Sequence, residues 1–140
     1  MIYQITPIIS PKPTDCGATC LKMLLDYYHI EADLDTLIKE CKTTLIGCSA
    51  GDINRCGRKY GLDMRAYKTE AKDIFTQDRP AILWWMRRHF VVYCGMNEDG
   101  KAVIINPDSG RYCRSKETFE SFYSGIELTN GEPQDLPNEI

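Results

Sequence analysis

The sequence lacks the main features of nucleic-acid-binding, membrane and secreted proteins. Its 17 Lys and Arg are outnumbered by 20 Asp and Glu, which gives a net charge of -3 and predicts no basic surface for a nucleic acid. No stretch approaches about 18 uninterrupted apolar residues, and the amino terminus has no charged segment followed by an apolar run. We therefore expect a soluble, unprocessed chain without nucleic-acid binding or membrane insertion.

The chain also lacks a recognisable disulfide framework or metal-ligand pattern. Its seven cysteines are odd in number and form no C-x-x-C pair: Cys16, Cys20, Cys41, Cys48, Cys56, Cys94 and Cys113. Structural zinc is the alternative use of so many cysteines, but their spacing does not match paired zinc ligands and there are only two histidines. The sequence thus predicts reduced thiols in the cytoplasm, with no metal and no cofactor.

Length and composition predict one domain. With 140 residues, 43% of them hydrophobic and 26% charged, the chain is long enough to build a core without disulfides or metals. We assign residues 1–129 to this domain. The tail, residues 130–140, is acidic and contains proline, and it is predicted to be disordered.

Helical periodicity dominates the first half of the chain and strand patterns dominate the second. A short strand at 2–5 and a proline-studded arm at 7–13 precede helices at 16–29, 34–41 and 50–60, capped at Asp33 and Ser49 and closed at Gly61. A strand at 62–67 and a helix at 70–75 follow, then strands at 81–86, 90–94, 102–105 and 111–113, a helix at 117–123 and a strand at 126–129. This order predicts an α+β fold with helices packed against an antiparallel meander, and a site in the groove between the two lobes.

One cysteine stands where a helix begins. Apolar residues recur at helical spacing after Cys16, and Thr14 and Asp15 are both good N-cap residues. Gly17 removes bulk beside the sulfur, and a helix N-terminus favours a thiolate, so this pattern is that of a nucleophile. The alternative is a small core residue, which is our interpretation of Cys20 one turn later.

A thiol nucleophile needs a base, and the chain offers two histidines. His29 lies thirteen residues from Cys16 on the same predicted helix, roughly 19 Å along its axis, which is out of reach. His89 opens a predicted strand, and Asn106, fixed by Pro107 at the end of the next strand, is placed to orient its ring. The alternatives are a surface histidine and an ordinary Asn-Pro turn.

Several ordered landmarks resemble the C39 peptidase family of papain-like cysteine peptidases, best known from bacteriocin-exporting ABC transporters. They are Asp15-Cys16-Gly17 with Cys20-Leu21-Lys22-Met23, Gly47-x-Ser49, Gly61-Leu62, Pro80-x-Ile82, His89-Phe90-Val91-Val92, and Asn106-Pro107 with Gly110. The resemblance spans about residues 9–125. It implies a papain-like fold, Cys16 as nucleophile, His89 as general base, and cleavage of peptides, often leader peptides that end in a double glycine.

Two positions depart from the family pattern. Asn106 stands where the family usually has Asp, a change compatible with activity because papain uses Asn in this role. Ser10 stands where the family has a glutamine that donates to the oxyanion, and losing such a donor costs on the order of 100- to 1000-fold in turnover. The backbone N–H of Cys16 would remain as one donor. Gln4, the only glutamine upstream, would need a different path of the arm to replace it.

Three functions remain open from the sequence. The first is a thiol peptidase that acts through Cys16, His89 and Asn106 on a peptide or protein. The second is a degenerate peptide-binding module with weak or no turnover, favoured by Ser10. The third is amide hydrolysis of a non-peptide substrate. Because the sequence contains no transporter segment, the chain would act alone or with a partner protein or transporter supplied by another chain.

Overall fold

The computed structural model describes residues 1–131. A 3-10 turn, η1 (Pro13–Asp15), leads into three helices, and two further helices lie among the strands. The helices are α1 (Cys16–Tyr27), α2 (Leu34–Glu40), α3 (Ala50–Lys59), α4 (Ala71–Thr76) and α5 (Lys116–Phe122). The strands are β1 (Met64–Lys68), β2 (Ala81–Trp85), β3 (His89–Met96), β4 (Ala102–Asn106), β5 (Gly110–Arg114) and β6 (Tyr123–Asn130).

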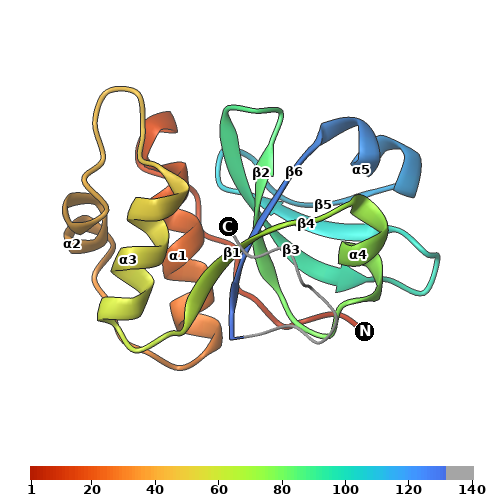
Figure 1. Cartoon of the computed structure of the whole chain (residues 1–140), viewed down its shortest axis with the longest axis horizontal. Helices are drawn as coiled ribbons and strands as arrows, with labels where there is room; N and C mark the ends of the chain where they lie inside the picture. The colour runs from red at the N-terminus through yellow and green to blue at the C-terminus, as the bar shows by residue number, and fades with distance from the viewer. Residues whose placement is uncertain (132–140) are drawn as a thin grey trace.

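The strands form one antiparallel sheet in the order β1-β6-β2-β3-β4-β5. The part from β2 to β5 is the predicted meander. The last strand, β6, inserts between β1 and β2, so the first and last strands in the chain are neighbours in the sheet. Figure 1 shows α1, α2 and α3 on one side of this sheet.

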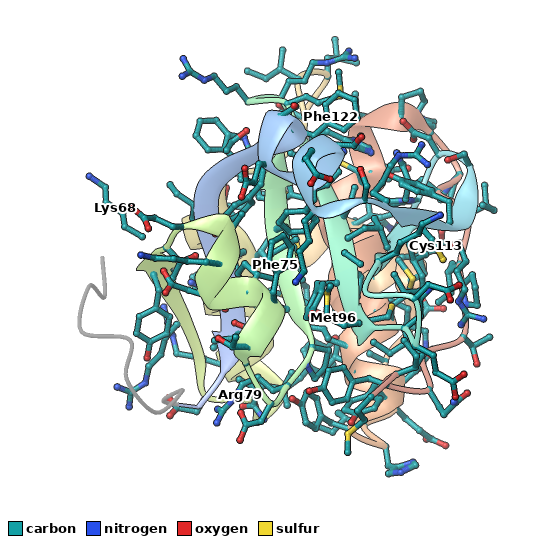
Figure 2. All side chains as sticks on the ribbon, turned by 90° about the vertical axis from the view of Figure 1, so that its right-hand side faces the viewer. Lys68, Phe75, Arg79, Met96, Cys113 and Phe122 are labelled. Atoms are coloured by element: carbon teal, nitrogen blue, oxygen red, sulfur yellow. The ribbon has the colours of Figure 1, made fainter. Side chains whose placement is uncertain are left out.

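Both faces of the sheet are buried, because alternate residues of each central strand point to opposite cores. On the inner face, Ile82, Val92 and Ile105 pack with the apolar side of α1. On the outer face, Leu83 and Val91 pack around Phe119 of α5. Figure 2 looks onto this outer face, where Phe75 of α4 and Phe122 of α5 lie over the strands. The second core explains why the strands read as nearly continuous apolar runs.

Helix boundaries follow the predicted caps closely. The Asp33 carboxylate accepts from the Thr36 N–H, and Ser49 forms a capping box with Asp52. Gly61 follows α3 with φ of +103°, the left-handed conformation that the predicted terminating glycine needs. These local signals are confirmed.

The predicted strand at 2–5 is wrong. Only an isolated bridge joins Ile2 to Gly95, and Tyr3 N–H donates to Cys94 O at 2.8 Å. The next donor, Ile5 N–H, turns back to Tyr3 O at 3.0 Å, so the ladder ends there. At the carboxyl end, Asn130 belongs to β6, one residue into the segment predicted to be disordered. The rest of that segment, 132–140, lies outside the described residues.

Candidate active site

Cys16 is the first residue of α1 and is packed inside the protein, with 7% of its surface exposed. The backbone N–H groups of Phe90 in β3 and of Gly17 are directed toward its sulfur closely enough to favour the thiolate. Burial outweighs them and, with the charges of Cys48 and Asp108, raises the pKa of the thiol. A helix N-terminus alone therefore does not make this thiol acidic.

His89 precedes Phe90, so the contact between Phe90 and the sulfur places the start of β3 at Cys16. The Nε2 of His89 lies 2.8 Å from Oδ1 of Asn106, at the end of β4. An amide oxygen only accepts, so Nε2 carries the hydrogen and the other ring nitrogen, Nδ1, keeps its lone pair. This is the tautomer that a base requires.

Asn106 is held at its amide oxygen. Besides its contact with His89, Oδ1 accepts the Asp108 N–H at 2.9 Å. This bond from a backbone donor keeps the amide oxygen toward His89. Asn106 thus has the contacts expected of a group that orients the imidazole.

The amino-terminal arm reaches the same turn. The N–H of Ser10 donates to Pro107 O at 2.8 Å, and the Ser10 hydroxyl donates to Thr19 Oγ1 at 3.0 Å. The hydroxyl is therefore committed to α1. Gln4 is exposed and follows Tyr3, which pairs with Cys94, roughly 17 Å along β3 from His89. The arm does not bring Gln4 near the site.

Two details of the predicted nucleophile are wrong. Asp15 stands at the N-cap of α1, but its side chain makes no capping bond because η1 already holds it at ψ of 8°, outside the extended range that capping needs. Gly17 does not open the thiol to solvent. A Cβ there would stand 2.6 Å from the Cys48 sulfur and 2.9 Å from Ile53 Cδ1, so this glycine lets α3 and the preceding loop pack on α1.

The structure adds two residues that the sequence reasoning missed. The Asp108 carboxylate lies 3.7 Å from Nε2 of His89. Its position two residues after Asn106, in an Asn-Pro-Asp turn, was the available signal. The second is Cys48, whose pKa is lowered chiefly by the approach of the Cys41 side chain. Only the tertiary packing brings these two side chains together.

Other features of the described residues lie apart from this cluster. A surface hollow of about 720 Å³ is lined by the end of α1 and the start of α2, including His29, and by none of the predicted site residues. All seven cysteines are free thiols. Within residues 1–131, no helix is long and apolar enough to cross a bilayer, and no three His, Cys, Asp or Glu side chains are grouped as metal ligands.

Comparison with known proteins decides the family. The model of the peptidase C39 family matches residues 6–134. The chain belongs to this family. Its sequence is 28% identical over 123 residues to the Escherichia coli protein named "Probable microcin-H47 secretion/processing ATP-binding protein MchF", covering 87% of this chain and 18% of that protein. The chain thus spans about a fifth of the curated relatives that it matches.

Solved structures confirm the papain-like α+β fold of this C39 domain. A double glycine motif protease from an AMS/PCAT transporter, solved with a leader peptide, superposes with a TM-score of 0.87 at 28% identity, covering 91% of both chains. The peptidase domain of Streptococcus ComA, a bifunctional ABC transporter, gives 0.83 at 22% identity, covering 90% of this chain and 97% of that one. The second likeness concerns the fold alone.

Proposed function

We propose that this C39 domain is a cysteine peptidase that cleaves peptides after a double glycine, with Cys16 as nucleophile, His89 as general base and Asn106 as the orienting group. The observation that carries the proposal is the pairing of two contacts at the start of β3. Phe90 N–H meets the Cys16 sulfur, and the adjacent His89 donates from Nε2 to Asn106 Oδ1. Nδ1 is then the nitrogen free to act on the thiol.

The proposed reaction proceeds in two halves. His89 Nδ1 takes the thiol proton as the Cys16 sulfur attacks the scissile carbonyl carbon, and the resulting imidazolium gives that proton to the leaving amine. A thioester to the amino-terminal fragment remains. Water then attacks the thioester with His89 as base, which releases the carboxylate and restores the thiol. Asn106 keeps the ring in one orientation throughout.

The burial of Cys16 supports a preference for glycine. With 7% of the residue exposed, the sulfur is reached only through a narrow approach. Residues without side chains beside the scissile bond meet the least steric opposition there. The double glycine motif protease of known structure that resembles this chain is consistent with this preference.

The proposed site has few hydrogen-bond donors to stabilise the oxyanion. The backbone N–H of Cys16 supplies one donor, and Ser10, whose hydroxyl is bonded to Thr19, does not reach as a glutamine would. Turnover is therefore expected to be slow. A peptide-binding module without turnover is the second candidate, and the committed Ser10 hydroxyl is the observation that favours it.

The setting of this activity is also part of the proposal. Matching relatives include a secretion/processing ATP-binding protein and transporter peptidase domains, so the partner is an ABC transporter, on the same or another chain. Seven free thiols fit the reducing cytoplasm. The substrate is then a peptide presented to that transporter.

Cleavage of a panel of double-glycine leader peptides, followed by mass spectrometry, tests the proposal. Wild-type protein should release the fragment ending in Gly-Gly, and replacing either glycine by valine should abolish cleavage. Cys16→Ala and His89→Ala should lose activity while keeping circular dichroism and peptide affinity. Binding of the panel without any product, even after long incubation, would select the binding module instead. Cleavage that survives in Cys16→Ala would contradict both.

A further inference from the structure

We infer that Asp108 is a positioning residue of the C39 site, whose carboxylate supplies beside His89 the negative charge that Asn106 lacks. This inference rests on the proposed peptidase function. It divides one task between two residues. Asn106 orients the imidazole by a hydrogen bond, and Asp108 stabilises the imidazolium that forms when the thiol loses its proton.

The geometry places the carboxylate on the correct nitrogen. Oδ2 of Asp108 lies 3.7 Å from Nε2 of His89, which at the same time lies 2.8 Å from Asn106 Oδ1. This separation is too long for a direct hydrogen bond but short for a charge interaction, which decays only as the inverse of distance. The His89 side chain is 14% exposed and that of Asp108 is 47% exposed. The half-exposed Asp108 carboxylate therefore acts on an imidazole ring that is mostly buried.

The turn between β4 and β5 fixes this arrangement. The N–H of Asp108 donates to Asn106 Oδ1 at 2.9 Å, and the N–H of Ser109 donates to Asn106 O at 3.0 Å. Both bonds use backbone donors. Replacing the Asp108 side chain by that of asparagine therefore removes the charge and keeps the bonds that shape the turn.

The charges around His89 make the contribution of Asp108 distinct. From α1, Cys16 lies beside Phe90, the residue after His89, and carries negative charge only after it has given up its proton. On the turn before β3, Arg87 and Arg88 are exposed to solvent. Asp108 is the carboxylate contacting the ring among the described residues. The same carboxylate opposes the Cys16 thiolate and raises the pKa of that thiol, though less than burial does.

The first test is the effect of Asp108→Asn on kcat and KM. Without the carboxylate, the imidazolium that forms in the transition state loses a stabilising charge, so kcat should fall roughly three- to tenfold with KM little changed. The difference should shrink in about 1 M NaCl, because a half-exposed charge is screened. An unchanged kcat in an active variant overturns the inference.

Matched variants separate charge from fold. Asp99→Asn removes one exposed carboxylate from the turn after β3, at the far end of the strand from His89, and should leave kcat unchanged. Asn106→Asp in the Asp108→Asn background returns a carboxylate to Nε2 and should restore kcat. Asp108→Glu should keep part of the wild-type kcat. Failure of both restorations would indicate that the side chain acts only on the structure of the turn.

A second readout needs no substrate and separates this inference from the proposed function. Alkylation of Cys16 by limiting iodoacetamide also requires the thiol to pass its proton to His89. In Asp108→Asn, labelling of Cys16 should slow about three- to tenfold, and labelling of Cys113, an exposed thiol, should not change. Slower Cys16 labelling without peptide cleavage by wild type would support the charge contact and overturn the peptidase proposal. Equal labelling rates would overturn the charge contact itself.

Discussion

Gly17 of α1 and Cys48 before α3 are packed so closely that the glycine has no room for a side chain. A Cβ at position 17 would lie 2.6 Å from the Cys48 sulfur, below any ordinary contact distance. The contact joins the helix that carries the proposed nucleophile to the loop that precedes α3. The position of Cys16 therefore depends on the absence of one methyl group at its neighbour.

We expect Gly17→Ala to destabilise the protein by about 1 to 3 kcal/mol, because overpacking forces α1 and α3 apart. Chemical denaturation measures this. The control is Gly51→Ala on α3, where the new Cβ meets only the Ser49 Oγ at 3.7 Å. There the helix propensity of alanine should stabilise the protein by about 0.5 to 1 kcal/mol. Equal effects of the two variants would contradict the packing argument.

Ser10→Gln should raise kcat about tenfold or more with little change in KM. A glutamine amide reaches toward the oxyanion from a backbone that Pro107 O already anchors, and its bond strengthens in the transition state. Steady-state kinetics on a cleaved leader peptide measure this. Ser10→Ala is the control and should not raise kcat, because it loses the bond to Thr19 without adding a donor. A flat or lower kcat in Ser10→Gln would mean that another group serves the oxyanion.

The sequence predicts most of the fold, because the signals for it are local. Asp33, Ser49 and Gly61 mark helix ends by their own chemistry, and the apolar runs after Ala81 form the strands they indicate. The insertion of β6 between β1 and β2 was not predictable in this way, since it is settled by packing between distant segments.

The sequence predicts Cys16 from a helix start, His89 from a strand start and Asn106 from a strand end, and their catalytic roles stay a prediction. In the structure Phe90, next to His89, lies by the Cys16 sulfur, and His89 bonds Asn106. The electrostatics of the site could not be predicted. The raised pKa of Cys16 comes from burial beneath neighbouring segments, which no helix-terminal pattern reveals. The approach of Cys41 to Cys48 likewise depends on how the segment between α2 and α3 folds.

Thiol reactivity should follow these environments. The sequence alone predicts that Cys16 is alkylated before the other six thiols. In the folded protein, burial raises the pKa of Cys16, and the approach of the Cys41 side chain lowers that of Cys48. We therefore expect limiting iodoacetamide at neutral pH to label Cys48 at least as fast as Cys16.

Peptide mapping by mass spectrometry measures both rates. His89→Ala should slow labelling of Cys16 and leave that of Cys48 unchanged, since only the first thiol uses the imidazole. Cys48→Ser should leave Cys16 labelling largely intact. If Cys16 is labelled equally in wild type and His89→Ala, the two residues do not act as a pair.

Glu127 should make stability depend on pH. Its carboxylate is fully buried in β6 without a well-formed hydrogen bond, and burial raises its pKa from 4.5 to about 7. Between pH 4.5 and about 7, therefore, Glu127 keeps its proton in the folded state and has lost it in the unfolded state. The stability this provides is complete below about pH 4.5 and is lost as the pH rises through 7, by about 3 kcal/mol for this group.

Glu127→Gln should flatten that dependence between pH 5 and about pH 8 in urea denaturation followed by fluorescence. The neutral amide has no proton to lose, so the variant should be the more stable protein at alkaline pH. Glu120→Gln, on the exposed face of α5, is the control and should keep the wild-type dependence. An unchanged slope in Glu127→Gln would mean that water or a partner reaches the carboxylate.

Covalent trapping of the nucleophile tests the central claim most directly. A leader peptide ending in a Gly-Gly aldehyde should add to the Cys16 sulfur as a hemithioacetal. Native mass spectrometry without a reduction step should then show the intact protein heavier by the mass of one peptide. Cys16→Ser and His89→Ala should show no adduct, and Cys48→Ser should show the full adduct. A peptide mass that remains in Cys16→Ser, or that disappears in Cys48→Ser, would contradict the assignment of Cys16 as the nucleophile.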